Sequence, residues 1–124
     1  MVADLDAERL AGLESELGPA VAVHRCDVTT EADVESLAAV TKSRFGCIHV
    51  VFANAGIGSV GPIREVDAKD WMRVIEVNLL GPVLTIKHCS AEMAEGGSIV
   101  ITASLNAVQP AAGMSAYCLS LIHI

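Results

Sequence analysis

Two hydroxyl side chains near the end of the sequence are the residues best suited to chemistry: Ser104 and Tyr117, thirteen residues apart. Ser104 follows an apolar run that predicts a strand, and Tyr117 lies at the start of a predicted helix. A serine hydroxyl beside a phenol can polarise a carbonyl group, and the phenol can donate or accept the proton. Because serine and tyrosine are common residues, the pair alone indicates this chemistry only weakly.

Asn78 is the least ordinary polar residue in the predicted helix 67–93. Helical spacing places it on the apolar face of that helix, together with Val74 and Pro82. A buried amide without hydrogen-bond partners costs about 1–3 kcal/mol. Pro82 has no N–H, so the carbonyl of Asn78 loses its helical partner and is free to hold a water. A kinked helix with a locally satisfied asparagine explains the same pattern equally well.

Short polar or small-residue segments follow three predicted strands. Because the carboxyl ends of parallel strands meet at one edge of a sheet, we expect these segments to lie together where ligands bind. Small residues there let a flat ligand approach the backbone, although an ordinary strand-to-loop turn also explains them. The segments are Asp27-Val28 after strand 20–25, Asn54-Ala55-Gly56 after strand 47–53, and Ser104 after strand 98–103.

The segment 56–61 has the spacing G-x-G-x-x-G, but we interpret it as a flexible loop. A dinucleotide-binding fingerprint opens a helix directly, so that the N-terminus of the helix faces the pyrophosphate. Here Pro62 follows, and the next helix is predicted only from Asp67.

Helical and strand patterns alternate along the sequence. Strands separated by helices predict parallel pairing with right-handed crossovers, which is a doubly wound α/β sheet. The chain of 124 residues is long enough for one domain, and its 52% hydrophobic and 3% aromatic content suits buried parallel strands. Asp6 is a candidate cap for the first helix, and Thr30 with Asp33 forms a candidate capping box for the second. The predicted helices are 6–17, 30–45, 67–93 and one from 114, and the predicted strands are 20–25, 47–53 and 98–103.

Charge and cysteine content exclude several classes of function. The net charge of −7 without a basic patch disfavours a nucleic-acid partner. No cysteine or histidine spacing is typical of a metal site, so we expect no metal. The start of the sequence is no signal peptide and no apolar run could span a bilayer, so we expect a cytoplasmic protein without a membrane partner. Structural thiols in a reducing compartment, rather than disulfides, are the favoured interpretation of Cys26, Cys47, Cys89 and Cys118.

Taken in order, these motifs resemble the classical short-chain dehydrogenase/reductase family. The resemblance runs from Ala3 to Cys118 and implies a Rossmann-type domain that binds NAD or NADP. It further implies hydride transfer between the nicotinamide and a small-molecule alcohol or ketone, in a protein that assembles as a homo-oligomer. The matching segments are Cys26-Asp27-Val28-Thr29, Asn54-Ala55-Gly56, Val77-Asn78-Leu79 and Ser98 to Ser104.

The resemblance assigns roles to three catalytic candidates. Ser104 would hydrogen-bond the substrate oxygen, and Tyr117 would donate or accept its proton. Asn78 would hold a water in the proton relay.

The resemblance also implies a cofactor site at the carboxyl ends of the strands. Asp27 and Val28 would contact the adenine, and the segment 54–56 would border the adenosine side. Asp4 would stand at the end of a strand and accept hydrogen bonds from the adenosine ribose. Because a carboxylate repels a 2′-phosphate, NAD is favoured over NADP.

The sequence departs from the family pattern in three ways: at the position four after the tyrosine, in the elements present, and in residues 119–124, which do not resemble the family's tyrosine helix. The family has a lysine four residues after the tyrosine, where this chain has Leu121, which cannot supply a positive charge. The family's first strand, glycine-rich loop and C-terminal strands have no counterpart here, so we expect a Rossmann-type sheet truncated at both ends. In this interpretation residues 1–118 are a partial NAD(P)-binding Rossmann domain, and residues 119–124 are a non-native tail.

Two functions follow from these observations. The first is a short-chain oxidoreductase whose isolated 124-residue chain is inactive. The alternative is a non-catalytic relative, without the active-site lysine, that binds a nucleotide or a partner protein.

Overall fold

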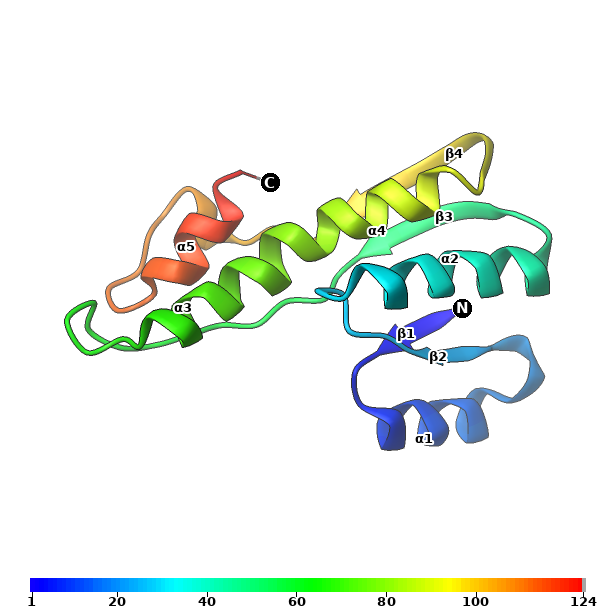
Figure 1. Cartoon of the computed structure of the whole chain (residues 1–124), viewed down its shortest axis with the longest axis horizontal. Coiled ribbons are helices and arrows are strands. Elements are labelled where there is room, and N and C mark those ends of the chain that lie inside the picture. Colours follow the sequence, from blue (N-terminus) through cyan, green and yellow to red (C-terminus); the bar gives the residue numbers. More distant parts are fainter. Residues whose placement is uncertain (124) are drawn as a thin grey trace.

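Strands and helices alternate along residues 1–123, which are the residues that the computed structural model describes (Figure 1). The strands are β1 (Val2–Asp4), β2 (Val23–Arg25), β3 (Ile48–Ala53) and β4 (Met93–Ile101). The α-helices are α1 (Ala7–Leu17), α2 (Glu31–Phe45), α3 (Ala68–Ile75), α4 (Gly81–Ser90) and α5 (Ser115–Leu121). Two 3₁₀ turns, η1 (Gly18–Ala20) and η3 (Leu105–Ala107), and one π-helical turn, η2 (Glu76–Leu80), complete the order.

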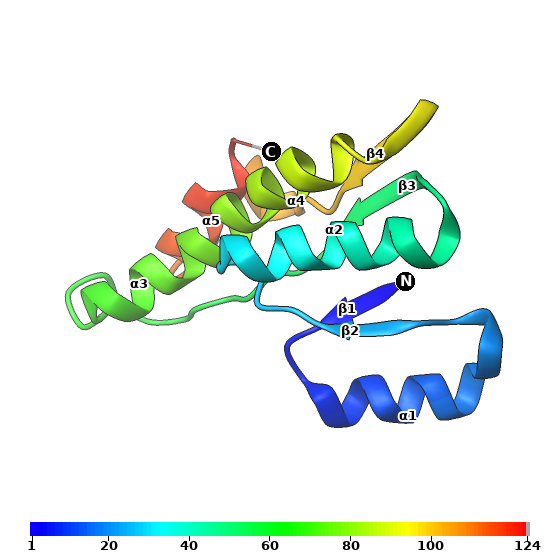
Figure 2. The same cartoon turned by 45° about the vertical axis from the view of Figure 1, so that its right-hand side comes forward.

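The strands form two parallel pairs, β1 with β2 and β3 with β4. Helix α1 packs on the first pair, whereas α2 and α4 pack beside each other on β3. In the view of Figure 2, β3 and β4 lie above α2, and β1 and β2 lie below it. Each parallel pair is joined through at least one helix, which confirms the predicted Rossmann-type α/β architecture.

The apolar core lies between the strands and helices α2 and α4. One cluster joins Ala38, Ile48, Val51 and Cys89, and a second joins Cys26, Val34 and Leu84. The sequence predicts that strand 47–53 is buried, and this is wrong for one of its faces. Val50 and Phe52 are each 63% exposed, because α2 and α4 cover the opposite face of β3.

The ends of the first two helices show which caps the sequence predicts correctly. Asp6 caps α1, because its carboxylate accepts from the backbone N–H groups of Glu8 and Arg9. The predicted capping box at Thr30 is wrong, since the Thr30 side chain makes no capping hydrogen bond. Asp33 instead turns back toward β2, where its carboxylate accepts from the backbone N–H of Asp27 at 3.0 Å.

The predicted long helix 67–93 is interrupted and ends earlier. Asp67 caps α3 as expected, but η2 follows before α4 continues to Ser90 (Figure 1). Pro82 cannot donate a backbone hydrogen bond, and the Gly81 N–H donates to the carbonyl of Glu76, five residues back. Among the helices described over residues 1–123, none is long and apolar enough to cross a membrane.

Strand β4 begins earlier than the predicted strand 98–103. Its register with β3 shifts between the pairs Ile48–Met93 and Val50–Ser98, so residues 94–97 bulge outward. Gly96 has φ 77°, a left-handed conformation that glycine adopts without steric cost. Beyond the bulge the pairing is regular as far as Ala53 and Ile101, and this register brings the carboxyl ends of both strands to the same edge.

Candidate functional site

Of two cavities among the described residues, the larger, about 720 Å³, runs along β1 and β3 between the two strand pairs and reaches the ends of β1, β2 and β3. Its lining comes from β1 and β3, from the residues that follow β1, β2 and β3, and from α2, α3, η2 and α4. All six residues predicted to bind a cofactor line this one cavity. The carboxyl-edge argument predicts this for five of them, whereas Asp4 was predicted from the family resemblance alone. The six residues are Asp4, Asp27, Val28, Asn54, Ala55 and Gly56.

Asp4 and Asp27 face this cavity with different numbers of protein partners. Asp4 Oδ1 accepts from the backbone N–H of Asp6 at 2.9 Å. Asp27 Oδ1 accepts from the backbone N–H of Thr29 at 3.0 Å and from its hydroxyl at 2.7 Å. Asp27 Oδ2 accepts from Arg73 Nη2 at 3.1 Å. The hydrogen bonds from Thr29, and then those from Arg73, hold the pKa of the Asp27 carboxyl below its usual range.

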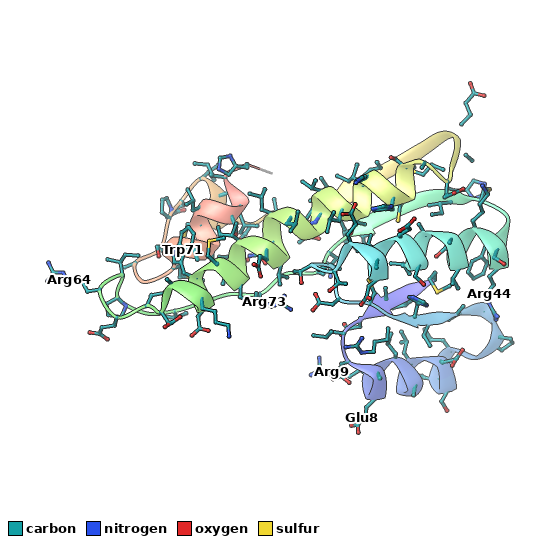
Figure 3. The ribbon with its side chains drawn as sticks, in the orientation of Figure 1. Glu8, Arg9, Arg44, Arg64, Trp71 and Arg73 are labelled. Atoms are coloured by element: carbon teal, nitrogen blue, oxygen red, sulfur yellow. The ribbon has the colours of Figure 1, made fainter. Side chains whose placement is uncertain are left out.

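Arg73 is a residue of the site that the sequence did not indicate. Its side chain extends from α3 and lies below that helix in Figure 3, and it lines the larger cavity. Its Nη1 donates to the Thr29 hydroxyl at 2.7 Å, across 44 positions of the sequence. A basic residue in the last turn of an amphipathic helix is ordinarily solvated, so no local pattern marks this contact.

A smaller cavity of about 420 Å³ adjoins the same loop. It is lined by Asn78 from η2 and by Tyr117 and Leu121 from α5. Residues 53–57 line both cavities and form a shared wall between them. The structure therefore brings two of the three catalytic candidates next to the predicted cofactor loop.

The side-chain amide of Asn78 is buried, with 2% exposure, and all of its donors are used. Its Oδ1 accepts from the backbone N–H of Ile57 at 2.8 Å, and its Nδ2 donates to the carbonyl of Ile57 at 2.9 Å. The second Nδ2 donor reaches Ser120 Oγ at 3.1 Å. The side chain thus fastens the loop to η2 and α5, and neither of its N–H donors is left for a ligand.

Ser104 is the one catalytic candidate that the structure does not bring into this group. It is half-buried and lines neither of the two cavities. Its hydroxyl accepts from the backbone N–H of Asn106 at 3.3 Å and so caps η3. Thr102 and Asn106 line the smaller cavity instead, and the Thr102 hydroxyl donates to Asn54 Oδ1 at 2.8 Å.

Helix α5 carries Tyr117 and is held in place at both of its ends. At its start, Trp71 Nε1 donates to Ser115 Oγ at 3.2 Å, and Figure 3 shows Trp71 between α3 and α5. At its end, Ser120 is fully buried and Leu121 is 5% exposed. Leu121 lies one turn beyond Tyr117 and presents an apolar side chain to the smaller cavity. The suggestion that residues 119–124 are non-native stays a prediction, and Ile124 lies outside the described residues.

Residues 1–120 match the family model described as short chain dehydrogenase. The chain belongs to the short-chain dehydrogenase family. The chain is 41% identical over 125 residues to momilactone A synthase of Oryza sativa subsp. japonica, across 97% of the chain and 46% of that protein. It is 31% identical to galactitol 2-dehydrogenase of Agrobacterium fabrum, across 97% of the chain and 48% of that enzyme. The chain spans about half the length of the curated relatives it matches.

Solved structures of short-chain dehydrogenases show the same arrangement. A short-chain dehydrogenase/reductase from Brucella melitensis superposes with a TM-score of 0.93 at 32% identity, over 98% of this chain and 52% of that one. One from Burkholderia phymatum, in complex with NAD, gives 0.89 at 32% identity over 97% and 45%. An alcohol dehydrogenase from Thermococcus sibiricus, complexed with 5-hydroxy-NADP, gives 0.88 at 28% identity over 97% and 53%. The two strand pairs of this chain are therefore placed as in complete members of the family.

Proposed function

We propose that this chain is part of an NAD(P)-dependent oxidoreductase that transfers a hydride between the cofactor and a small-molecule alcohol or ketone. The observation that carries the proposal is the shared wall of residues 53–57. It joins the cavity lined by all six cofactor candidates to the cavity that contains Tyr117. A dinucleotide needs such a continuous path, because its adenine and nicotinamide ends bind at separate places along the sheet edge.

The residues of the larger cavity suit the adenosine half of a nicotinamide cofactor. Asp4 uses Oδ1 internally and offers its other oxygen to ribose hydroxyls. The carboxylate of Asp4 favours NAD over NADP, because it would repel a 2′-phosphate. The Burkholderia relative in complex with NAD supports this choice, whereas the Thermococcus relative was solved with an NADP derivative.

The smaller cavity has some of the groups needed where the hydride and the proton are transferred, but it lacks a positive charge beside the phenol. A bound nicotinamide supplies the hydride chemistry, and the chain must hold and move the proton. Tyr117 is the proposed proton donor or acceptor, Asn78 is proposed to hold a water at its carbonyl, and Ser104 is proposed to bind the substrate oxygen. Leu121 brings an apolar group to the place where a positive charge would help the phenol ionise. We therefore propose that the isolated chain binds the cofactor but does not turn over.

Isothermal titration with NAD and NADP, followed by an absorbance assay for NADH, tests this proposal. We expect heat of binding from NAD, weaker binding of NADP, and no NADH from NAD with any of a panel of secondary alcohols. An Asp4→Asn variant should narrow the difference between NAD and NADP, because it removes the negative charge while keeping the size of the side chain. Absence of NAD binding would refute the cofactor assignment, and steady production of NADH would refute the proposed inactivity.

The second candidate function is nucleotide binding without catalysis, and one observation favours it. Leu121 is only 5% exposed, so its apolar side chain, one turn beyond Tyr117, contributes to the stability of the fold. Cofactor binding without turnover is common to both candidates. A longer parent sequence with lysine at this position would favour the oxidoreductase, and one with leucine would favour the non-catalytic relative.

A further inference from the structure

We propose that Arg73 is a positioning residue that fixes the carboxylate of Asp27 so that one of its oxygens is free to recognise the amino group of adenine. This inference rests on the proposed function, because it requires the larger cavity to be the adenosine side of a nucleotide site. It assigns a role to a residue on α3 that lies far from Asp27 in the sequence, 46 positions away.

The supporting geometry is a closed ring of hydrogen bonds among three side chains. Arg73 donates to Asp27 Oδ2 through Nη2 at 3.1 Å and to the Thr29 hydroxyl through Nη1 at 2.7 Å. The Thr29 hydroxyl then donates to Asp27 Oδ1 at 2.7 Å. The planar guanidinium suits this ring because two of its N–H groups point in fixed, neighbouring directions, which the single ammonium of lysine cannot reproduce.

Counting acceptor sites shows what the ring leaves for a ligand. A carboxylate can accept about four hydrogen bonds, roughly two on each oxygen. Both sites on Asp27 Oδ1 are occupied by Thr29, and one on Oδ2 is occupied by Arg73. One acceptor site on Oδ2 remains, in a side chain that lines the larger cavity. The matching ligand group is therefore a hydrogen-bond donor, such as the amino group of adenine.

The backbone around Asp27 is held by contacts that do not involve Arg73. On one side, the Asp27 N–H donates to Asp33 Oδ2 at 3.0 Å. On the other side, Val28 packs against Gly81, where a Cβ would lie 2.9 Å from Val28 Cγ2. Loss of the Arg73 side chain should therefore leave the loop in place and change mainly the direction and charge environment of the carboxylate.

The experiment compares AMP with IMP, which lacks the amino group of adenine, as ligands of the 124-residue chain. Isothermal titration should give tighter binding of AMP than of IMP to the unmodified protein. In Arg73→Gln we expect AMP to weaken about fivefold while IMP changes little, which is the effect of losing a partly exposed charged pair. Arg73→Lys should recover part of the preference, because it restores the charge but not the two-pronged geometry.

The matched control is Arg9→Gln, which breaks another arginine–aspartate contact, 3.3 Å long, on the exposed side of α1. It should leave the binding of both nucleotides unchanged. Urea unfolding of both variants checks that each remains folded under the titration conditions.

The possible outcomes separate the role of Arg73 from the existence of the nucleotide site. An unchanged preference for AMP in Arg73→Gln, or equal weakening of AMP and IMP, would overturn the positioning role and leave the nucleotide site standing. Absence of binding by both nucleotides to the unmodified protein would overturn the proposed cofactor site and this inference with it. Lost preference with retained IMP binding supports the inference.

Discussion

The side-chain amide of Asn78 makes two hydrogen bonds with the backbone of Ile57, one to its N–H and one to its carbonyl, as a residue of a neighbouring strand would. Oδ1 accepts from the Ile57 N–H at 2.8 Å, and Nδ2 donates to the Ile57 carbonyl at 2.9 Å. The contact fixes the loop after β3 on η2, and Ser120 extends it to α5. One side chain thus sets the relative position of the loop that borders the proposed cofactor and the helix that carries Tyr117.

Replacement of Asn78 by alanine should destabilise the protein by about 1–3 kcal/mol, because the two hydrogen bonds to the Ile57 backbone and the buried one to Ser120 are lost. Asn78→Asp should also destabilise, since it keeps the acceptor but loses both donors. Urea unfolding followed by circular dichroism measures the difference. Gln109→Ala, a truncation at an exposed loop position, is the control and should change stability by less than about 0.5 kcal/mol. Equal effects of the Asn78 and Gln109 variants would contradict the importance of the contact.

Gly81 should tolerate no larger residue, because a Cβ would lie 2.9 Å from Val28 Cγ2. We expect Gly81→Ala to destabilise by about 1–3 kcal/mol through overpacking. Adding Val28→Ala should recover part of this loss, which a double-mutant cycle would measure. Gly12→Ala on α1 is the matched control: nothing lies within 4 Å of its added Cβ, and the change should stabilise the helix by about 0.5–1 kcal/mol. Similar destabilisation at both glycines would disprove the steric explanation.

The four cysteines should react with alkylating reagents in a definite order. Burial, with the nearby carboxylates of Asp33 and Asp27, raises the pKa of the Cys26 thiol to about 11. Burial also raises the pKa of Cys89. Because the thiolate is the reactive form, both should react slowly with iodoacetamide at pH 7.5, after the half-buried Cys47 and Cys118. Peptide mass spectrometry over a time course measures the order, and early labelling of Cys26 in the folded protein would contradict it.

Stability should fall in acid in a way that depends on Asp27. Hydrogen bonds from Thr29 and Arg73 lower the pKa of this carboxyl in the folded state below its ordinary value of 3.8. The stability it contributes is therefore present above pH 3.8 and is lost as the pH falls through the lower folded-state value. Urea midpoints measured between pH 6 and pH 2.5 should fall less steeply below pH 4 for Asp27→Asn than for the unmodified chain. Parallel curves would show that the folded state does not favour the ionised carboxyl.

Leu121 should behave as a core residue. Replacing it by lysine should cost about 2–4 kcal/mol, because apolar packing is lost and a charge enters a mostly buried position. Leu121→Met is the size-matched control and should cost less than about 1.5 kcal/mol. Thermal unfolding of the two variants gives the comparison, and a lysine variant as stable as the methionine variant would show that this position is open to solvent.

Much of the fold follows from local signals in the sequence. Asp6 and Gly18 mark the ends of α1, and Asp67 marks the start of α3, because capping and left-handed glycine depend on neighbouring residues only. The loop interpretation of 56–61 is confirmed for the same reason, since the next helix begins at Ala68.

Signals that depend on distant partners were not available from the sequence. Asp33 looked like part of a capping box, but it bonds to Asp27, and that choice depends on how β2 meets α2. The burial of one face of β3 depends on α2 and α4, which a run of apolar residues does not specify.

The same distinction applies to the candidate site. Strand ends indicated five of the six cofactor candidates in the larger cavity, because parallel strands bring their carboxyl ends together, and the family resemblance indicated Asp4. Arg73 and Ser120 were missed, since each acquires its partner only through packing between elements far apart in the sequence. The predicted strand 98–103 ends too late, because β4 stops at Ile101, and Ser104 caps η3 instead, which no spacing rule foresees.

The wide turn η2 also limits how the segment from α3 to α4 can change in length. Each residue advances an α-helix by about 100°, so removing one residue from Glu76–Leu80 would rotate everything after it. Leu84 and Cys89 would swing away from the core clusters they now complete. Insertions and deletions should therefore be far rarer here than substitutions. The length of this five-residue turn determines which side of α4 faces the core.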